Sequence, residues 1–183
     1  DRKQIKRERR RVHEAGVSID VLNGTELDKR ALDDVFRLYT SISDRKWGRP
    51  YLTRAFFDVM PKERALIVTA KLDADIVAMT ISCEKGKHIY GRHWGTSVDV
   101  PGLHFELCYY QLLERAIATG CTLVEAGAQG EHKLKRAGLP GCTHSRHQFA
   151  DKNFGDAVYR FLDEERAAVV AERDELNAHS PFK

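Results

Sequence analysis

Three runs rich in β-branched and aromatic residues occupy the middle of the chain, at residues 65–71, 76–83 and 88–94. Runs of this length and composition, bounded by polar and glycine-containing segments, predict β-strands. The links between them, residues 72–75 and 84–87, are long enough only for hairpins, because a parallel connection needs a crossover of a dozen or more residues. The pattern therefore predicts an antiparallel meander.

Apolar residues at helical spacing precede and follow this meander. A first helix is predicted after a capping-box pattern at residues 25–28, with its apolar face at Leu27, Ala31, Val35, Leu38 and Ile42. A shorter helix is predicted from Thr53, with Phe56, Phe57 and Met60 directed inward. A third helix, ended by Gly120, is predicted from the stripe Phe105, Cys108, Tyr109, Leu112, Ala116 and Ile117.

Further strands are predicted at residues 17–22, 121–126 and 143–150. The third helix fits as a crossover between residues 88–94 and 121–126, so these two strands are predicted to be parallel neighbours. A long helix capped by Asn153 is predicted to end the chain, with a core-facing stripe at Phe154, Val158, Phe161, Leu162 and Val169. The order of elements predicts an α/β (α+β) fold with a mixed, mostly antiparallel sheet.

The length of 183 residues, with 42% hydrophobic and 31% charged residues, is typical of a soluble globular domain with a core. No apolar run approaches the roughly 20 residues of a membrane span, and no signal-peptide pattern is present, so a cytoplasmic protein is expected. No C-x-x-C pair occurs among the four cysteines. A metal site is not expected, because His144 and His147 would point to opposite faces of an extended segment.

The net charge of +3 comes from the first twelve residues, which hold seven Lys and Arg against Asp1 and Glu8. The remaining residues carry 23 basic and 25 acidic side chains. We therefore predict a basic linker helix over residues 1–16, exposed and outside the core, followed by one domain over residues 17–183. A phosphate-binding arm is the alternative. Because the chain begins with Asp1, we expect it to be part of a longer product.

A glycine-rich turn at residues 125–133 carries an unusual concentration of polar chemistry, in Gln129, Glu131, His132 and Lys133. Glycines allow the backbone to turn sharply and to approach a ligand closely. The turn follows a predicted strand, at the edge where open α/β sheets commonly bind ligands. We interpret it as the main candidate site, with an ordinary charged surface loop as the alternative.

Five segments occur in an order that resembles a known family: residues 3–12, 46–54, 89–95, 103–111 and 125–133. The chain resembles predicted N-acyltransferases related to peptidoglycan biosynthesis, which are similar to Fem-type peptidyltransferases of the GNAT superfamily. The resemblance covers almost the whole chain. It implies a GNAT-like acyl-CoA N-acyltransferase fold, in which the parallel pair splays apart at the crossover helix. It also implies a preceding domain in the full-length protein.

The resemblance implies either acyl-CoA or aminoacyl-tRNA as the acyl donor. GNAT acetyltransferases usually bind the pyrophosphate of coenzyme A on an R/Q-x-x-G-x-G/A loop, of which residues 92–97 are only a partial and early match. Fem-type enzymes use aminoacyl-tRNA and lack that loop. A second departure is the step at residues 136–139, where the family favours Arg-Gly-aromatic. The acceptor is expected to be a small-molecule or peptide amine, such as a cell-wall precursor.

Transfer of an acyl group to an amine needs a base, hydrogen-bond donors for the oxyanion and cations for anionic groups. Glu131 and His132 are the candidate catalytic bases, and Lys133 and Arg92 are candidate anion clamps. Gln129 is a candidate donor to a carbonyl group. We expect these five side chains to converge on one cleft.

Three further candidates for substrate binding are Trp94, His104 and Glu106. Trp94 alternates with Tyr90 and Arg92 along its predicted strand, so the three are predicted to share one face. His104 and Glu106 begin the crossover helix, where free amides favour an anion, although Glu106 is also explained by the helix dipole. Glu106, Tyr110 and Glu114 form a stripe that faces either the cleft or solvent. A non-catalytic GNAT-like module that recognises a cell-wall precursor or an acyl chain is the alternative function.

Overall fold

The computed structural model describes residues 2–45, 49–125, 127, 133 and 138–178. The chain divides into two compact units, Asp1–Gly127 and Ala128–Lys183. Each unit is described by itself.

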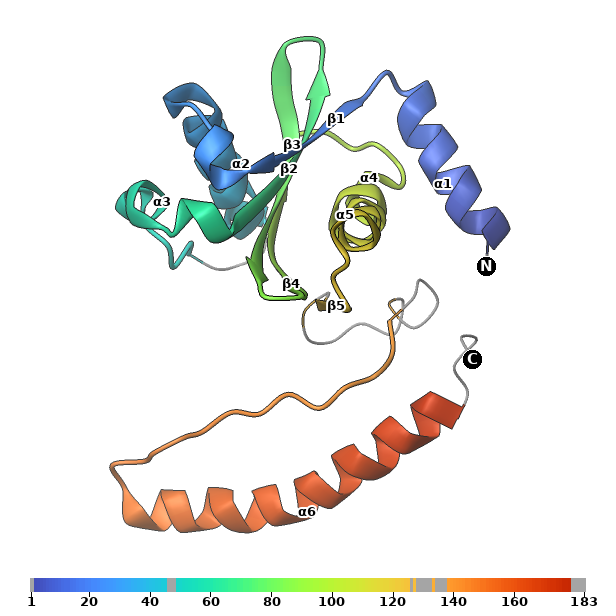
Figure 1. Cartoon of the computed structure of the whole chain (residues 1–183). Coiled ribbons are helices and arrows are strands. Elements are labelled where there is room, and N and C mark those ends of the chain that lie inside the picture. The colour runs from blue at the N-terminus through green and yellow to red at the C-terminus, as the bar shows by residue number, and fades with distance from the viewer. Residues whose placement is uncertain (1, 46–48, 126, 128–132, 134–137, 179–183) are drawn as a thin grey trace. The chain divides into compact units, whose positions relative to one another are not determined.

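A five-stranded sheet with the order β1-β2-β3-β4-β5 forms the centre of the first unit (Figure 1). The strands are β1 (Ser18–Asn23), β2 (Ala65–Leu72), β3 (Asp75–Lys85), β4 (His88–Thr96) and β5 (Leu123–Glu125). The first four are antiparallel neighbours. β4 and β5 are parallel, with His88 opposite Leu123 and Tyr90 opposite Glu125. The predicted meander and the predicted parallel pair are both confirmed.

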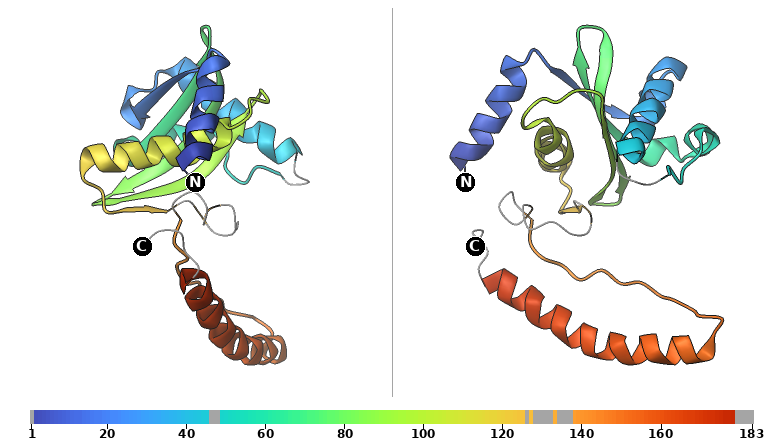
Figure 2. Two further views of the ribbon diagram at one scale, coloured as in Figure 1. Left: turned by 90° about the vertical axis from the view of Figure 1, so that its right-hand side faces the viewer. Right: turned by 180° about the vertical axis from the view of Figure 1, so that it is seen from behind.

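Helices cover both faces of this sheet, as two opposite views show (Figures 1 and 2). One face carries α2 (Lys29–Arg45) and α3 (Arg54–Val59). The other carries α1 (Arg2–Glu14) and a continuous crossover helix made of α4 (Leu103–Phe105), the π-helical segment η3 (Glu106–Tyr110) and α5 (Gln111–Thr119). Short 3-10 turns, η1 (Gly24–Glu26) and η2 (Lys62–Arg64), precede α2 and β2. Each face has its own apolar core.

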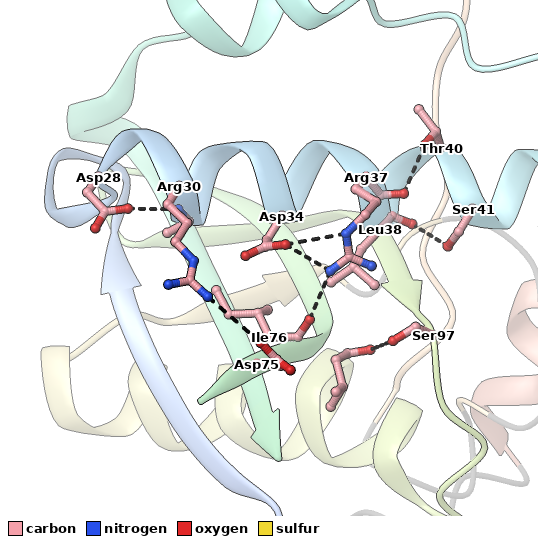
Figure 3. Close-up of polar contacts among 12 residues, drawn as sticks. Asp28, Arg30, Asp34, Arg37, Leu38, Thr40, Ser41, Asp75, Ile76 and Ser97 are labelled. Carbon is pink, nitrogen blue, oxygen red and sulfur yellow. Dashed lines mark hydrogen bonds and ion pairs between the residues drawn. The ribbon is translucent and has the colours of Figure 1, made fainter. Parts of the chain in front are cut away.

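Local chemistry fixes the start and the docking of α2. The capping box lies two residues earlier than predicted, between Asn23 and Glu26, and Asp28 instead caps α2 by accepting the amide of Ala31 at 2.7 Å. Arg37 donates to the carbonyl of Ile76 at 3.3 Å and pairs with Asp34, which ties α2 to β3 (Figure 3).

Close packing between α2 and the sheet depends on a glycine in β4. A Cβ atom on Gly95 would lie 2.3 Å from the carbonyl oxygen of Leu38, so no larger residue fits there without moving the helix. Phe57 of α3 is fully buried as predicted, whereas Phe56 is exposed, because this short helix presents only one face to the core.

The basic N-terminal segment forms a helix, but the prediction that it lies outside the core is wrong. Val12 of α1 is only 2% exposed and belongs to the core beneath the crossover helix, and Glu8 is also buried. The charge run conceals one inward face, in which Ile5, Glu8 and Val12 recur at helical spacing. The assignment of residues 17–183 to one domain, and the preceding domain, stay predictions.

The second unit consists of an extended segment and the long helix α6 (Lys152–Ala178). Residues 143–150 form no strand, so that prediction is wrong; an apolar pattern supplies a strand only where another strand pairs with it. Asp151, and not Asn153, caps α6 by accepting the amide of Phe154 at 2.7 Å.

That the stripe of α6 faces the core stays a prediction, because α6 and the core belong to different units. Phe154, Phe161 and Val169 of this stripe are exposed. The extended segment covers only a narrow strip of the helix, where Phe149 contacts Phe154 and Tyr159. No helix in the described part of the chain is both long and apolar enough to cross a membrane.

Candidate functional site

A β-bulge places Arg92 outside the regular pairing of β3 and β4. Gly91 lies opposite Ser82 and His93 lies opposite Ile81, so Arg92 is the extra residue, and it is exposed. The bulge also shifts the alternation of side chains. Ile89 and Trp94 both pack on the crossover-helix side, which puts Tyr90 on the opposite face from Trp94. The prediction that Tyr90, Arg92 and Trp94 share one face is therefore wrong.

Trp94 and His104, two predicted substrate-binding residues, meet between β4 and the start of the crossover helix. Their ring centroids lie 5.2 Å apart at 78°, an edge-to-face contact. His104 also contacts the ring of Tyr109 at 5.8 Å. The structure thus brings these two candidates together, at the end of β4 that follows the bulge.

Glu106 is enclosed in a polar network with α1. It is 3% exposed, and its carboxylate accepts hydrogen bonds from Arg9 Nε at 3.1 Å and from Gln111 Nε2 at 2.8 Å. Arg9 also binds Glu114, and this hydrogen bond is the largest cause of a raised pKa for the guanidinium. A substrate group at Glu106 would therefore have to displace Arg9.

The predicted stripe of Glu106, Tyr110 and Glu114 packs against α1, which binds it through Arg9 and Glu8. Tyr110 donates a short hydrogen bond to Glu8, which also accepts from Gln4 at 2.9 Å. Gly102, just before the crossover helix, lies against the backbone of Glu8, where a Cβ would approach within 3.2 Å. These contacts fasten α1 to the crossover helix.

Cys108 lies on the π-helical segment and is not a candidate nucleophile. Desolvation raises the pKa of its thiol to about 12, despite an opposing hydrogen bond with Thr80. The thiol is therefore protonated at neutral pH. Among the described residues, no group of three His, Cys, Asp or Glu side chains is arranged to hold a metal ion.

A second aromatic group, on the α2 side of the sheet, was missed by sequence reasoning. The Tyr51 hydroxyl lies 3.3 Å from His93 Nε2, and the ring of Tyr39 meets the His93 ring edge-on at 5.0 Å. Burial first, and the charge of Arg92 second, lower the pKa of His93. A signal was present, because Tyr51 and His93 lie in two of the five segments that carry the family resemblance.

The glycine-rich turn lies largely outside the described residues, which exclude Gln129, Glu131 and His132. Lys133 is half-buried; burial lowers the pKa of its ammonium group, and its carbonyl accepts the amide of Gly138 at 2.9 Å. Lys133 belongs to the second unit and Arg92 to the first. Their convergence on one cleft therefore stays a prediction.

Solved structures share the fold at low sequence identity. An aminoglycoside acetyltransferase from an uncultured soil metagenomic sample has a TM-score of 0.55 and 12% identity, over 76% of this chain and 99% of that one. A ribosomal-protein-alanine N-acetyltransferase from Brucella melitensis biovar Abortus 2308 has a TM-score of 0.53 and 15% identity, over 73% and 99% of the two chains. No curated protein matches the chain. The GNAT-like fold is confirmed.

The family resemblance is confirmed over the full length of the sequence. The sequence model of FemAB_like, described as peptidoglycan biosynthesis/recognition, matches residues 1–183. Family and fold together support the predicted class, an N-acyltransferase, and do not favour a non-catalytic binding module. The chain belongs to the FemAB-like family.

Proposed function

We propose that this protein transfers an acyl or aminoacyl group to the amine of a peptide or small molecule that belongs to cell-wall synthesis. The observation that carries the proposal is the edge of β4. Its described pairing with β5 covers only His88 to Tyr90, whereas β4 continues through the bulge at Arg92 to Thr96. In the part of the chain that the structure describes, no strand pairs with this edge beyond Tyr90, and we propose that its backbone groups bind an extended donor there.

The proposed chemistry assigns roles to residues of both units. Glu131 or His132 accepts a proton from the attacking amine, and Gln129 donates to the carbonyl oxygen. Arg92 and Lys133 bind anionic groups of the donor or acceptor. Trp94 and His104, whose ring centroids lie 5.2 Å apart, offer an aromatic surface for the substrate at the end of β4.

The donor is proposed to be aminoacyl-tRNA, with acyl-CoA as the second candidate. Exposed cations cover the outer face of α1, at Arg2, Lys3, Lys6, Arg7, Arg10 and Arg11. Such a surface suits a polyphosphate chain, and the sequence lacks the usual coenzyme A pyrophosphate loop. Acetyl-CoA remains the alternative because the solved structures of similar fold include acetyltransferases.

The test uses the full-length protein with acetyl-CoA or aminoacyl-tRNA as donor and an amine-bearing muropeptide as acceptor. Glu131→Gln and His132→Gln are assayed separately, and loss of the base is expected to lower kcat by about 10²–10⁴-fold. Near wild-type turnover in both variants would remove these residues from the mechanism. Binding of the muropeptide without turnover, with either donor, would favour the binding module instead.

A further inference from the structure

The fold builds the contact between Tyr51 and His93 from distant parts of the chain. Tyr51 lies between α2 and α3, whereas His93 lies in β4, 42 positions later. Tyr39 of α2 holds the segment in place, since its hydroxyl accepts the amide of Leu52 at 3.1 Å. Thr80 of β3 fixes the strand by donating to the carbonyl of His93 at 2.9 Å.

Access to solvent distinguishes this pair from a buried polar contact. Tyr51 is 76% exposed, whereas Tyr39 behind it is buried and His93 is half-buried. The Tyr39 and Tyr51 rings meet nearly at right angles, with centroids 6.4 Å apart. Aromatic faces of this kind attract an ammonium group, so a cation can approach the Tyr51 hydroxyl from solvent.

Charge and burial keep the imidazole in the form that accepts a proton. The titratable and charged groups that face His93 are Tyr39 from α2, Tyr51 from the segment before α3 and Arg92 from its own strand. Burial and the adjacent Arg92 guanidinium both oppose a positive charge on the His93 ring. With its pKa lowered, the neutral form of His93 is favoured at pH 7.

We propose that Tyr51 and His93 form the acceptor-amine subsite and remove the first of the two protons that the acceptor must lose. The proposal rests on the acyl transfer proposed above. A primary amine with the pKa of a lysine side chain, about 10.4, arrives as an ammonium ion, which has no electron pair for attack. One base must make the free amine, and another must take a proton after attack.

An ammonium N–H bond breaks and its proton passes to the Tyr51 oxygen, while the Tyr51 hydroxyl proton passes to His93 Nε2 and later to solvent. The freed electron pair on nitrogen forms the new N–C bond. The C–O bond of an ester donor, or the C–S bond of a thioester, breaks with its electron pair on the leaving atom. Glu131 or His132 carries the second N–H proton to that atom.

The same strand offers a matched control. His88 Nδ1 lies 3.1 Å from the Tyr90 hydroxyl, with ring centroids 6.0 Å apart at 57°. The corresponding values for Tyr51 and His93 are 5.7 Å and 55°. The control pair, however, joins neighbours only two positions apart and lies before the bulge. Its substitution tests the effect of losing a Tyr–His contact on β4 without touching the proposed subsite.

The kinetic experiment compares His93→Gln and Tyr51→Phe with His88→Gln and Tyr90→Phe in the full-length protein. At pH 7, His93→Gln is expected to lower kcat/KM for the acceptor by about 10²–10⁴-fold, and the two control variants to stay near wild type. The deficit in kcat/KM should shrink as the pH rises from 6.5 to 9, because a larger fraction of the acceptor amine is then already deprotonated in solution. Wild-type rates in His93→Gln, a deficit independent of pH, or an equal loss in His88→Gln would overturn the proposal.

A binding measurement separates this proposal from the acyl-transfer function. N-acetyl-lysine amide is titrated into the protein, and imidazole ¹⁵N signals are followed, with His93→Gln identifying the relevant resonance. We expect this resonance to shift in the wild type and in Tyr90→Phe but not in Tyr51→Phe. A shift of the His93 resonance without acyl transfer from either donor would support the amine subsite and contradict the acyl-transfer function. Transfer that is unaffected in His93→Gln, with no shift, would reject the subsite and retain the function.

Discussion

The two faces of the central sheet use polar side chains in opposite ways. On the crossover-helix side, Glu106 is buried and its carboxylate is bound by Arg9 and Gln111. On the α2 side, His93 is half-buried and contacts the exposed Tyr51. A buried charge whose hydrogen bonds are all supplied by the protein contributes to structure, whereas a polar pair open to solvent can bind a ligand. We therefore expect the polar side chains on the crossover-helix side to stabilise the fold and those on the α2 side to bind a ligand.

The largest effect is expected from Glu106→Ala, which removes the acceptor that Arg9 and Gln111 share. Breaking a buried ion pair costs about 3 kcal/mol at the low end of the usual range, and the low end applies because Arg9 is 39% exposed. Chemical denaturation would measure this loss. Glu114→Ala is the control, since Glu114 is exposed and its ion pair should contribute less than about 1 kcal/mol.

The comparison between the faces would fail if Glu106→Ala left unfolding unchanged and lowered acyl transfer instead. Glu106 would then belong to the substrate site, as the sequence first indicated. The double variant Arg9→Leu/Glu106→Leu sharpens the test. It should recover part of the lost stability, because it removes both charges together and leaves neither one unpaired.

A smaller effect is expected from Tyr110→Phe, which deletes the hydroxyl that donates to Glu8. The buried carboxylate keeps its hydrogen bond from Gln4, so the expected loss is about 1 kcal/mol of unfolding free energy. Thermal unfolding would measure it. Tyr90→Phe, on the opposite face, serves as the control and should lose less. A greater loss of unfolding free energy in Tyr90→Phe than in Tyr110→Phe would show that polar contacts on the α2 side stabilise the fold more, contrary to the comparison.

The smallest effect concerns the pH dependence of stability. His93 has a lowered pKa in the folded protein, so below about pH 6.5 the unfolded chain binds more protons than the folded one. The contribution of His93 to the unfolding free energy should therefore decrease as the pH drops below that value and stay constant above it. His93→Gln should reduce the slope, measured by denaturation between pH 5 and 7. An unchanged slope would show that His93 is not responsible for it.

Sequence patterns predicted the parts of the fold that local chemistry decides. The short links between β2, β3 and β4 correctly predicted antiparallel pairing, and the long crossover before β5 correctly predicted a parallel pair with β4. The bulge at Arg92 could not be predicted, because the strand pattern gives no sign of one extra residue. Because Arg92 is an extra residue, it shifts the alternation of side chains and so determines on which face of the sheet Trp94 lies.

Long-range packing explains the remaining errors. The basic composition of α1 concealed the spacing of Glu8 and Val12, which face the crossover helix. The apolar pattern of residues 143–150 could not show whether a partner strand would be available. His93 was missed because its chemistry depends on Tyr51, which no local pattern connects to it. Trp94 and His104 were predicted from the sequence to bind substrate, and this role stays a prediction, whereas their mutual contact could be seen only in the fold.

The contact between Arg9 and Glu106 also has a consequence for the order of folding. The two residues are 97 positions apart, so the contact closes a loop around almost the whole sheet. During synthesis α1 leaves the ribosome before the sheet, and its partner helix appears only after four strands have been made. Closing so large a loop early is entropically costly, which favours a late docking of α1. Substitutions at this contact should then accelerate unfolding and leave the folding rate almost unchanged.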